Sequence, residues 1–279
     1  MQIQARAKIN WALEIRGRRS DGYHLLDGVM QPLALSDTLE IEPSETLSLQ
    51  VAGACLSQGE DNLVLRAARA LQNKACCQKG ARITLTKRIP MGAGLGGGSA
   101  DAAAALKGLN TLWDTGLSME EMLSLGEKLG ADVPFCLLDA PMRAQGIGEI
   151  LTPVPCGRTF PLVLIQPCEG LSTKDIFTAY HHLSPPGGDV EKAVLALAEG
   201  NLPLMEQAAV NMLEAVSIPK KPEILAARQA LYQAGAAFAR MTGSGSVVFG
   251  AFETKDAAAA AFDALSRRYA TCILTETAL

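Results

Sequence analysis

The sequence has few of the residues that build a metal site or a disulfide framework. It contains only three histidines, and its seven cysteines are irregularly spaced, with no pair in a C-x-x-C arrangement. Structural zinc sites are usually built from closely spaced pairs of this kind, so we expect none here. An odd number of scattered cysteines is typical of reduced thiols in a cytosolic protein.

Long hydrophobic runs are also missing. The first ten residues, MQIQARAKIN, lack the apolar segment of a signal peptide. No apolar run approaches the roughly 20 residues that a membrane-spanning helix requires. We therefore expect a cytoplasmic protein with no membrane partner.

An excess of basic residues is absent as well. The 279-residue chain has a net charge of −4, with 19% charged and 48% hydrophobic residues. Domains with a broad nucleic-acid-binding surface usually carry a basic excess, so we expect no nucleic-acid partner. A small anionic ligand is compatible with this charge, because a few local cations and backbone amides can hold it.

Alternating and helical periodicities are mixed along the chain. Apolar and polar residues alternate from Ile3 to Ile15, which predicts a strand with one buried face and with Lys8 and Asn10 on its polar face. Strand and helix patterns follow one another without strict alternation, which favours an α+β fold over a doubly wound sheet. Helical spacing begins near Asp61, Ser99, Ser118, Val190, Pro222 and Asp256. The composition becomes proline-rich near residue 150, and this change predicts a domain boundary there.

One glycine-rich segment stands out. PMGAGLGGGSADAAAAL begins at Pro90, holds five glycines within seven residues, and opens an alanine-rich helix near Ser99. Glycines let backbone N–H groups approach an anion closely, and a helix N-terminus offers unpaired amides. A tight turn would need only one or two glycines, so the segment favours phosphate binding. It is no Walker A loop, and it lies too far into the chain for a dinucleotide fingerprint.

The segment resembles the phosphate loop of the GHMP kinases, which include galactokinase and the homoserine and mevalonate kinases. AKINWALEI, at 7–15, and MTGSGSVVFGAF, at 241–252, resemble the N-terminal and C-terminal motifs of the same family. The resemblance implies a two-domain α+β GHMP kinase fold. Its N-terminal domain, over 1–150, would be ribosomal-protein-S5-like and bind ATP, and its C-terminal domain, over 151–279, would be a ferredoxin-like α/β sandwich. It also implies ATP and Mg²⁺ as cofactors.

Further blocks narrow the resemblance to one branch of the family. IRGRRSDGYHLLDGVMQPL, DNLVLRAARAL, LGADVPFCL and GIGEIL resemble the kinases that phosphorylate the 2-hydroxyl of a cytidine-diphosphate-linked methylerythritol, in the non-mevalonate route to isoprenoid precursors. The resemblance implies that Tyr23 and His24 line the cytosine site, where an aromatic ring can stack and histidine can donate or accept hydrogen bonds. Thr173 and Phe177, in LSTKDIF, resemble positions of the same pocket.

The resemblance also implies catalytic roles. Asp132 would accept the proton of the attacking hydroxyl, Lys8 would hold Asp132 ionised, and Asn10 would bind the substrate. From the residues alone, Lys8 and Asn10 read as a solvated strand face, and Asp132 reads as a helix cap in a loop that leads into an apolar segment. Lys87 reads equally as a phosphate contact or as a solvated strand lysine.

The nucleotide phosphates are expected on the glycine-rich segment. The residues implied in ATP binding are Pro90, Met91, Gly92, Ala93, Gly94, Leu95, Gly96, Gly97, Gly98 and Ser99. Ser99 would contact a phosphate or the metal ion, whose ligands the sequence does not assign.

Two alternative functions stay open at this point. The first is a GHMP kinase for another small alcohol, of mevalonate type or a sugar, against which the Gly-Tyr-His segment near Tyr23 argues. The second is a nucleotide-binding regulator without catalysis, against which Lys8, Asn10 and Asp132 argue. Residues 180–205 resemble no family segment, and His181 and His182 are expected on the surface. The sequence predicts no oligomeric state.

Overall fold

The structure is a computed structural model that describes residues 1–54, 56–180, 183 and 185–279. The predictions for Cys55, His181 and His182 therefore fall outside the described residues. The chain packs into two compact units, each with a hydrophobic core of its own. The first unit comprises Met1–Ala7, Leu35–Ile89 and Gly96–Asp139, and the second comprises Lys8–Ala34, Pro90–Leu95 and Ala140–Leu279. The boundary near residue 150 concerns the two domains of the family, and it stays a prediction.

Two long paired strands contribute residues to both units. They are β1 (Gln2–Arg18) and β2 (His24–Ser44). In β1, every residue from Ala7 to Glu14 is buried. The expectation of one solvated face is therefore wrong for this stretch, because its polar side chains contact other chain segments instead of water. Glu14, for example, accepts the backbone N–H of Gly188 at 2.9 Å.

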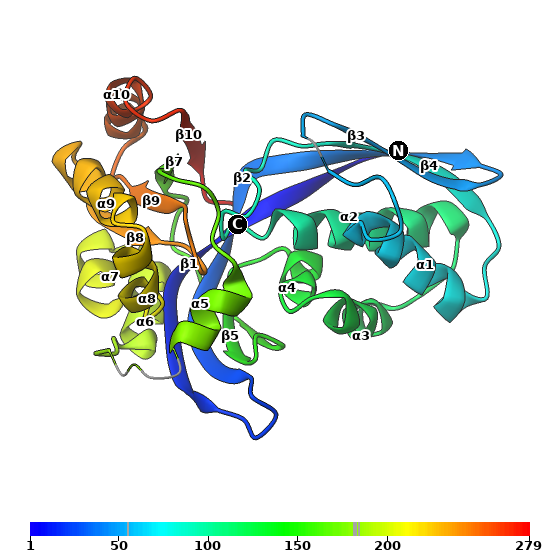
Figure 1. The fold of residues 1–279 in the computed structure, drawn as a ribbon, viewed down its shortest axis with the longest axis horizontal. Coiled ribbons are helices and arrows are strands. Elements are labelled where there is room, and N and C mark those ends of the chain that lie inside the picture. The colour runs from blue at the N-terminus through cyan, green and yellow to red at the C-terminus, as the bar shows by residue number, and fades with distance from the viewer. Residues whose placement is uncertain (55, 181–182, 184) are drawn as a thin grey trace. The chain divides into compact units, whose positions relative to one another are not determined.

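The first unit packs helices against a small sheet (Figure 1). The strands are β3 (Leu47–Ala52), β4 (Gly80–Thr86) and the Thr38–Ser44 part of β2, with β4 parallel to β3 and antiparallel to β2. The helices are α1 (Leu63–Ala75), α2 (Gly97–Trp113), α3 (Met119–Leu129) and α4 (Val133–Leu138). Apolar residues of both sets form one core.

Helix α2 is the central helix of that core. Its run of alanines, at 102–105, is almost fully buried, and such small side chains let neighbouring elements pack closely against the helix. The loop around Asp132 leads into an apolar segment, as expected, and this segment forms α4. Pro134 suits the first turn of a helix, and the apolar residues after it are buried in the core.

The second unit contains a four-stranded antiparallel sheet. Its strand order is β10 (Thr271–Glu276), β7 (Pro161–Gln166), β9 (Val248–Ala251) and β8 (Phe238–Met241). Helices α9 (Glu223–Gln233) and α10 (Lys255–Leu265) pack on this sheet. Trp11 of β1 packs against the rings of Phe160, Phe238 and Phe249, with centroids 5.2, 5.4 and 5.5 Å away.

Shorter elements complete the second unit. They are β5 (Met142–Gly146), which pairs with β2, β6 (Ile150–Pro153), and the helices α5 (Thr173–Tyr180), α6 (Val190–Glu199), α7 (Leu202–Ala208) and α8 (Glu214–Lys220). None of the helices in the described ranges has the length and apolar character needed to cross a membrane. The six described cysteines are free, which confirms the expectation of thiols for them.

Candidate functional site

In the second unit, the glycine-rich segment meets both β1 and the C-terminal glycine motif. The Lys8 backbone N–H donates to the Leu95 carbonyl at 2.9 Å. The Thr242 hydroxyl donates to the Gly94 carbonyl at 3.3 Å and accepts the Asn10 backbone N–H at 3.1 Å. Three motifs that lie far apart in the sequence are therefore in contact, through backbone groups and the Thr242 hydroxyl.

Close packing explains one of the five glycines. Gly94 has a φ of 77°, and a Cβ atom built on it would lie only 2.2 Å from the Thr242 carbonyl oxygen. A side chain at Gly94 would therefore collide with the glycine motif as well as strain the backbone. Packing against the glycine motif therefore accounts for Gly94 without any bound anion.

Lys8 and Asn10 are buried side chains. Their exposed fractions are 3% and 5%, and the Lys8 Nζ donates to the Asn10 Oδ1 at 2.8 Å. The solvated strand face is therefore wrong as an interpretation of this pair. The Lys8 Nζ also lies 3.5 Å from where a Cβ of Gly243 would stand, so the ammonium lies beside the glycine motif.

In the first unit, the start of α2 carries the second half of the glycine-rich segment. The helix begins at Gly97, after Gly96 with a φ of 70°, and no side chain caps its N-terminus. An uncapped first turn presents backbone amides and a partial positive charge, the arrangement that binds anions. Ser99 lies in this first turn, and its Oγ is 3.8 Å from where a Cβ of Gly130 would stand.

Asp132 precedes α4 in the N-cap position but does not cap the helix. Its side chain makes no capping hydrogen bond, so the interpretation of Asp132 as a helix cap is wrong. The approach of Gly130 to Ser99 places the Gly-Ala-Asp segment beside the first turn of α2. Lys8 belongs to the other unit, and its pairing with Asp132 stays a prediction.

Lys87 is buried between two carboxylates. Its Nζ donates to Asp37 of β2 and, at 2.7 Å, to Asp101 of α2, so the solvated strand lysine is wrong. Burial, together with the charge of Asp37, raises the pKa of Asp101 to about 7, although Lys87 opposes this shift. Sequence reasoning missed Asp37 and Asp101, because a polar residue in an alternating strand or a helix reads as exposed.

The residues implied in cytosine binding lie in the second unit. The His24 ring packs against Phe177 and Tyr180, with centroids 5.3 and 5.8 Å away. The Thr173 Oγ1 is 2.9 Å from the Ser244 Oγ, so α5 contacts the C-terminal glycine motif. Tyr23 is 61% exposed, which leaves its ring accessible to a ligand. The structure thus groups His24 with Phe177.

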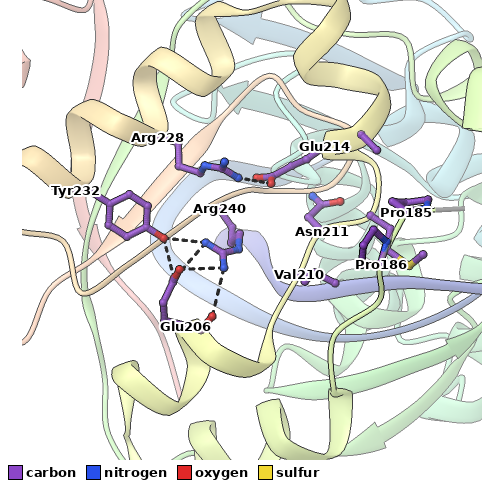
Figure 2. A pocket seen from close by; sticks show the side chains of 11 residues that line it. Pro185, Pro186, Glu206, Val210, Asn211, Glu214, Arg228, Tyr232 and Arg240 are labelled. Carbon is purple, nitrogen blue, oxygen red and sulfur yellow. Dashed lines mark hydrogen bonds and ion pairs between the residues drawn. The ribbon is translucent and has the colours of Figure 1, made fainter. Parts of the chain in front are cut away.

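A pocket of about 420 Å³ in the second unit contains none of the predicted site residues. Figure 2 shows Arg240 bonded to Glu206 and Tyr232, and Arg228 paired with Glu214, so its charged groups satisfy one another. Glu214 also accepts the Met241 backbone N–H at 2.9 Å. The lining residues are Pro185, Pro186, Glu206, Val210, Asn211, Met212, Glu214, Ala215, Arg228, Tyr232 and Arg240. They support the strand that leads into the glycine motif.

The donor atoms of the described residues are compatible with the expected Mg²⁺ if a nucleotide supplies most of its ligands. Within the described part of the chain, no three His, Cys, Asp or Glu side chains are grouped so that they could hold a metal. Mg²⁺ in phosphoryl-transfer sites keeps several waters and takes phosphate oxygens plus one or two protein oxygens, so it needs no such group. The Ser99 hydroxyl, in the first turn of α2, is an oxygen of the required kind.

Two family matches cover most of the chain between residues 62 and 271. Residues 62–140 match the GHMP kinases N terminal domain, and residues 193–271 match the GHMP kinases C terminal domain. A homoserine kinase from Cytophaga hutchinsonii has the same fold, with a TM-score of 0.70 at 16% identity over 100% of this chain and 94% of its own.

Relatives of higher identity share one name. The 4-diphosphocytidyl-2-C-methyl-D-erythritol kinase of Pelotomaculum thermopropionicum is 44% identical over 88% of this chain and 87% of its own. That of Paramagnetospirillum magneticum is 43% identical over 93% and 91%. A crystal structure of a 4-(cytidine 5'-diphospho)-2C-methyl-D-erythritol kinase covers 100% of both chains at 36% identity, with a TM-score of 0.86. The chain therefore belongs to the 4-diphosphocytidyl-2-C-methyl-D-erythritol kinase family of the GHMP kinases.

Proposed function

We propose that this protein transfers the γ-phosphoryl group of ATP to the 2-hydroxyl of 4-diphosphocytidyl-2-C-methyl-D-erythritol, in the non-mevalonate route to isoprenoid precursors. One observation carries the proposal: relatives named for this kinase are up to 44% identical over nearly the whole chain. The contacts among β1, the glycine-rich segment and the C-terminal glycine motif support the same activity. We infer a cytoplasmic location from the free cysteines.

Asp132 accepts the proton of the attacking 2-hydroxyl in the proposed mechanism. Lys8 supplies the positive charge that keeps this carboxylate ionised, since a nearby cation favours the charged form of an acid. Asn10, which accepts a hydrogen bond from the Lys8 Nζ, orients Lys8 and binds the substrate. Phosphoryl transfer requires mainly positioning and charge stabilisation, and these three side chains supply both.

The glycine-rich segment, from Pro90 to Ser99, binds the phosphates of ATP. Its glycines admit the nucleotide close to the backbone, and the uncapped start of α2 offers amides to the phosphate oxygens. The Ser99 hydroxyl adds a side-chain contact to a phosphate or to Mg²⁺. The metal ion, when bound, neutralises the charge that develops on the transferred group.

Tyr23, His24, Thr173 and Phe177 select the cytidine-linked substrate. Tyr23 exposes an aromatic face on which a pyrimidine can stack. The packing of His24 against Phe177 fixes the orientation of its imidazole, whose nitrogens can bond the base edge. A kinase for mevalonate, a sugar or homoserine has no use for such a site, so this grouping favours the cytidine compound.

ADP release tests the proposal directly. The purified protein is given ATP and Mg²⁺ with 4-diphosphocytidyl-2-C-methyl-D-erythritol, and in parallel with mevalonate and with homoserine. We expect turnover with the cytidine compound alone. Turnover with another alcohol alone would contradict the assignment of Tyr23 and His24, and no substrate-dependent ADP release would favour the nucleotide-binding regulator.

A further inference from the structure

Three charged side chains form a buried cluster in the first unit. Asp37, Lys87 and Asp101 have exposed fractions of 0%, 9% and 3%, and Lys87 pairs with both carboxylates. A buried charge cluster of this kind contributes little to stability, because desolvation of the charges offsets their attraction. Stability therefore does not explain why these three side chains are buried in the core.

Asp37 holds the chain that enters the glycine-rich segment. One of its carboxylate oxygens accepts the backbone N–H groups of both Arg88 and Ile89, the latter at 2.8 Å. These are the last two residues before Pro90. The other oxygen accepts the Lys87 Nζ. A single buried carboxylate thus bonds three consecutive residues at this point of the chain.

The same cluster reaches the chain that leaves the segment. Lys87 donates to Asp101, which lies in the second turn of α2. The Lys87 Nζ also stands 3.3 Å from where a Cβ of Gly97 would lie, so it is beside the first residue of the helix. The second Asp101 oxygen, Oδ1, has no hydrogen-bond partner among the described residues.

We propose that Asp37 is a positioning residue for ATP: it fixes the entry to the phosphate loop through the Arg88 and Ile89 amides, and through Lys87 it holds that entry against the start of α2. This inference rests on the proposed function, because it takes the glycine-rich segment as the ATP site. In this proposal Asp37 acts through the Arg88 and Ile89 amides and through Lys87, without contacting the nucleotide itself.

Replacement of the carboxylate by an amide tests the role. Asp37→Asn keeps the shape of the side chain but turns an N–H₂ group toward either Lys87 or the two amides. A displaced loop should weaken binding of a non-hydrolysable ATP analogue about tenfold or more, since small displacements in a phosphate-transfer site are costly. KM for ATP should rise in parallel, whereas KM for the cytidine compound should stay within about twofold of the wild type. Calorimetry gives the first value and steady-state kinetics the others.

Glu42→Gln is the matched control. Glu42 also lies in β2 and pairs with Arg82 of β4, but this pair is exposed. The variant should bind the analogue as the wild type does. A folded Asp37→Asn protein with unchanged analogue affinity would overturn the proposal, as would equal changes in both KM values.

A measurement on the wild type covers the case in which Asp37→Asn fails to fold. Hydrogen exchange should find the Arg88 and Ile89 amides protected already in the nucleotide-free protein. Exchange of both amides at the rate of an open loop would overturn the proposal. A wild type that binds the analogue without phosphorylating the cytidine compound would instead contradict only the proposed substrate. A wild type that binds no analogue would contradict both.

Discussion

Lys8 and Asn10 lie two residues apart on β1 and are buried together, joined by a hydrogen bond of 2.8 Å between the Lys8 Nζ and the Asn10 Oδ1. A buried ammonium needs polar partners, and this amide oxygen is one of them. Asp132 likewise lacks the role of a helix cap, since it occupies the N-cap position of α4 but its side chain makes no capping hydrogen bond. At the scale of single residues, the structure therefore replaces a solvated strand face by a buried hydrogen-bonded pair, and a helix cap by an aspartate that does not cap.

Asp132→Asn should retain ATP binding and lose most turnover. An amide cannot accept the hydroxyl proton, and loss of a general base typically costs about 10²–10⁴-fold in rate. The measurement is kcat for the cytidine compound, together with the affinity for an ATP analogue. Asp139→Asn is the control, because Asp139 flanks the other end of α4 and pairs with Arg6 at 3.5 Å. A near-normal kcat in Asp132→Asn would show that Asp132 is not the general base.

Tyr23→Ala should weaken binding of the cytidine compound more than binding of ATP. Stacking of a base on an aromatic side chain is worth about 1–3 kcal/mol, so KM for the cytidine compound should rise about tenfold while KM for ATP stays unchanged. Tyr23→Phe keeps the ring and should resemble the wild type in both values. Equal effects of Tyr23→Ala on the two KM values would show that Tyr23 does not contact the cytosine.

Secondary-structure elements differ in how well the sequence predicted them. The strand of AKINWALEI and the helix after the glycines are confirmed, because each carries a long periodic pattern or follows strong turn residues. The short helices α5, α7 and α8 and the strand β10 were not predicted. Their few residues give too short a pattern, and their packing in the second unit stabilises them.

Gly94→Ala should disrupt the contact between the phosphate loop and the C-terminal glycine motif. The new Cβ would meet the Thr242 carbonyl oxygen at 2.2 Å, so the backbone must shift. We expect weaker binding of an ATP analogue and a loss of about 1–3 kcal/mol in the free energy of unfolding. Gly116→Ala is the control that separates backbone strain from the collision of the new Cβ. Gly116 also has a positive φ, of 68°, but no atom lies near its Cβ position. Equal losses in the two variants would assign the effect to backbone strain alone.

The residues of the proposed chemistry are divided between the two compact units. Lys8, Asn10 and Tyr23 belong to the second unit, and Ser99 and Asp132 belong to the first. Each unit has its own core, and β1 and β2 contribute to both. At the scale of the whole molecule, each unit therefore holds some of the residues to which the proposal assigns a role.

Stability of the whole molecule should depend on the charge of Asp101. Its pKa is raised from 3.8 to about 7 by burial, so the folded protein binds more protons than the unfolded chain between these pH values. The contribution of Asp101 to the free energy of unfolding should thus fall as the pH rises from about 4 to about 7, and then level off. Asp101→Asn cannot titrate there. Urea unfolding at several pH values gives the free energy of unfolding of the wild type and of the variant. The wild-type value minus the variant value should fall across this pH range. A flat or rising difference would contradict the prediction.

The sequence by itself determined the family, the α+β class, the glycine-rich segment and the substrate class implied by Gly-Tyr-His. These depend on local patterns and on motifs in a fixed order, which remain readable without contacts. Only the tertiary structure decided that Lys8 and Asn10 are buried, that Gly94 faces Thr242, and that Asp37 and Asp101 enclose Lys87. Burial and pairing arise from segments far apart in the chain, and a periodic pattern reports only on neighbours.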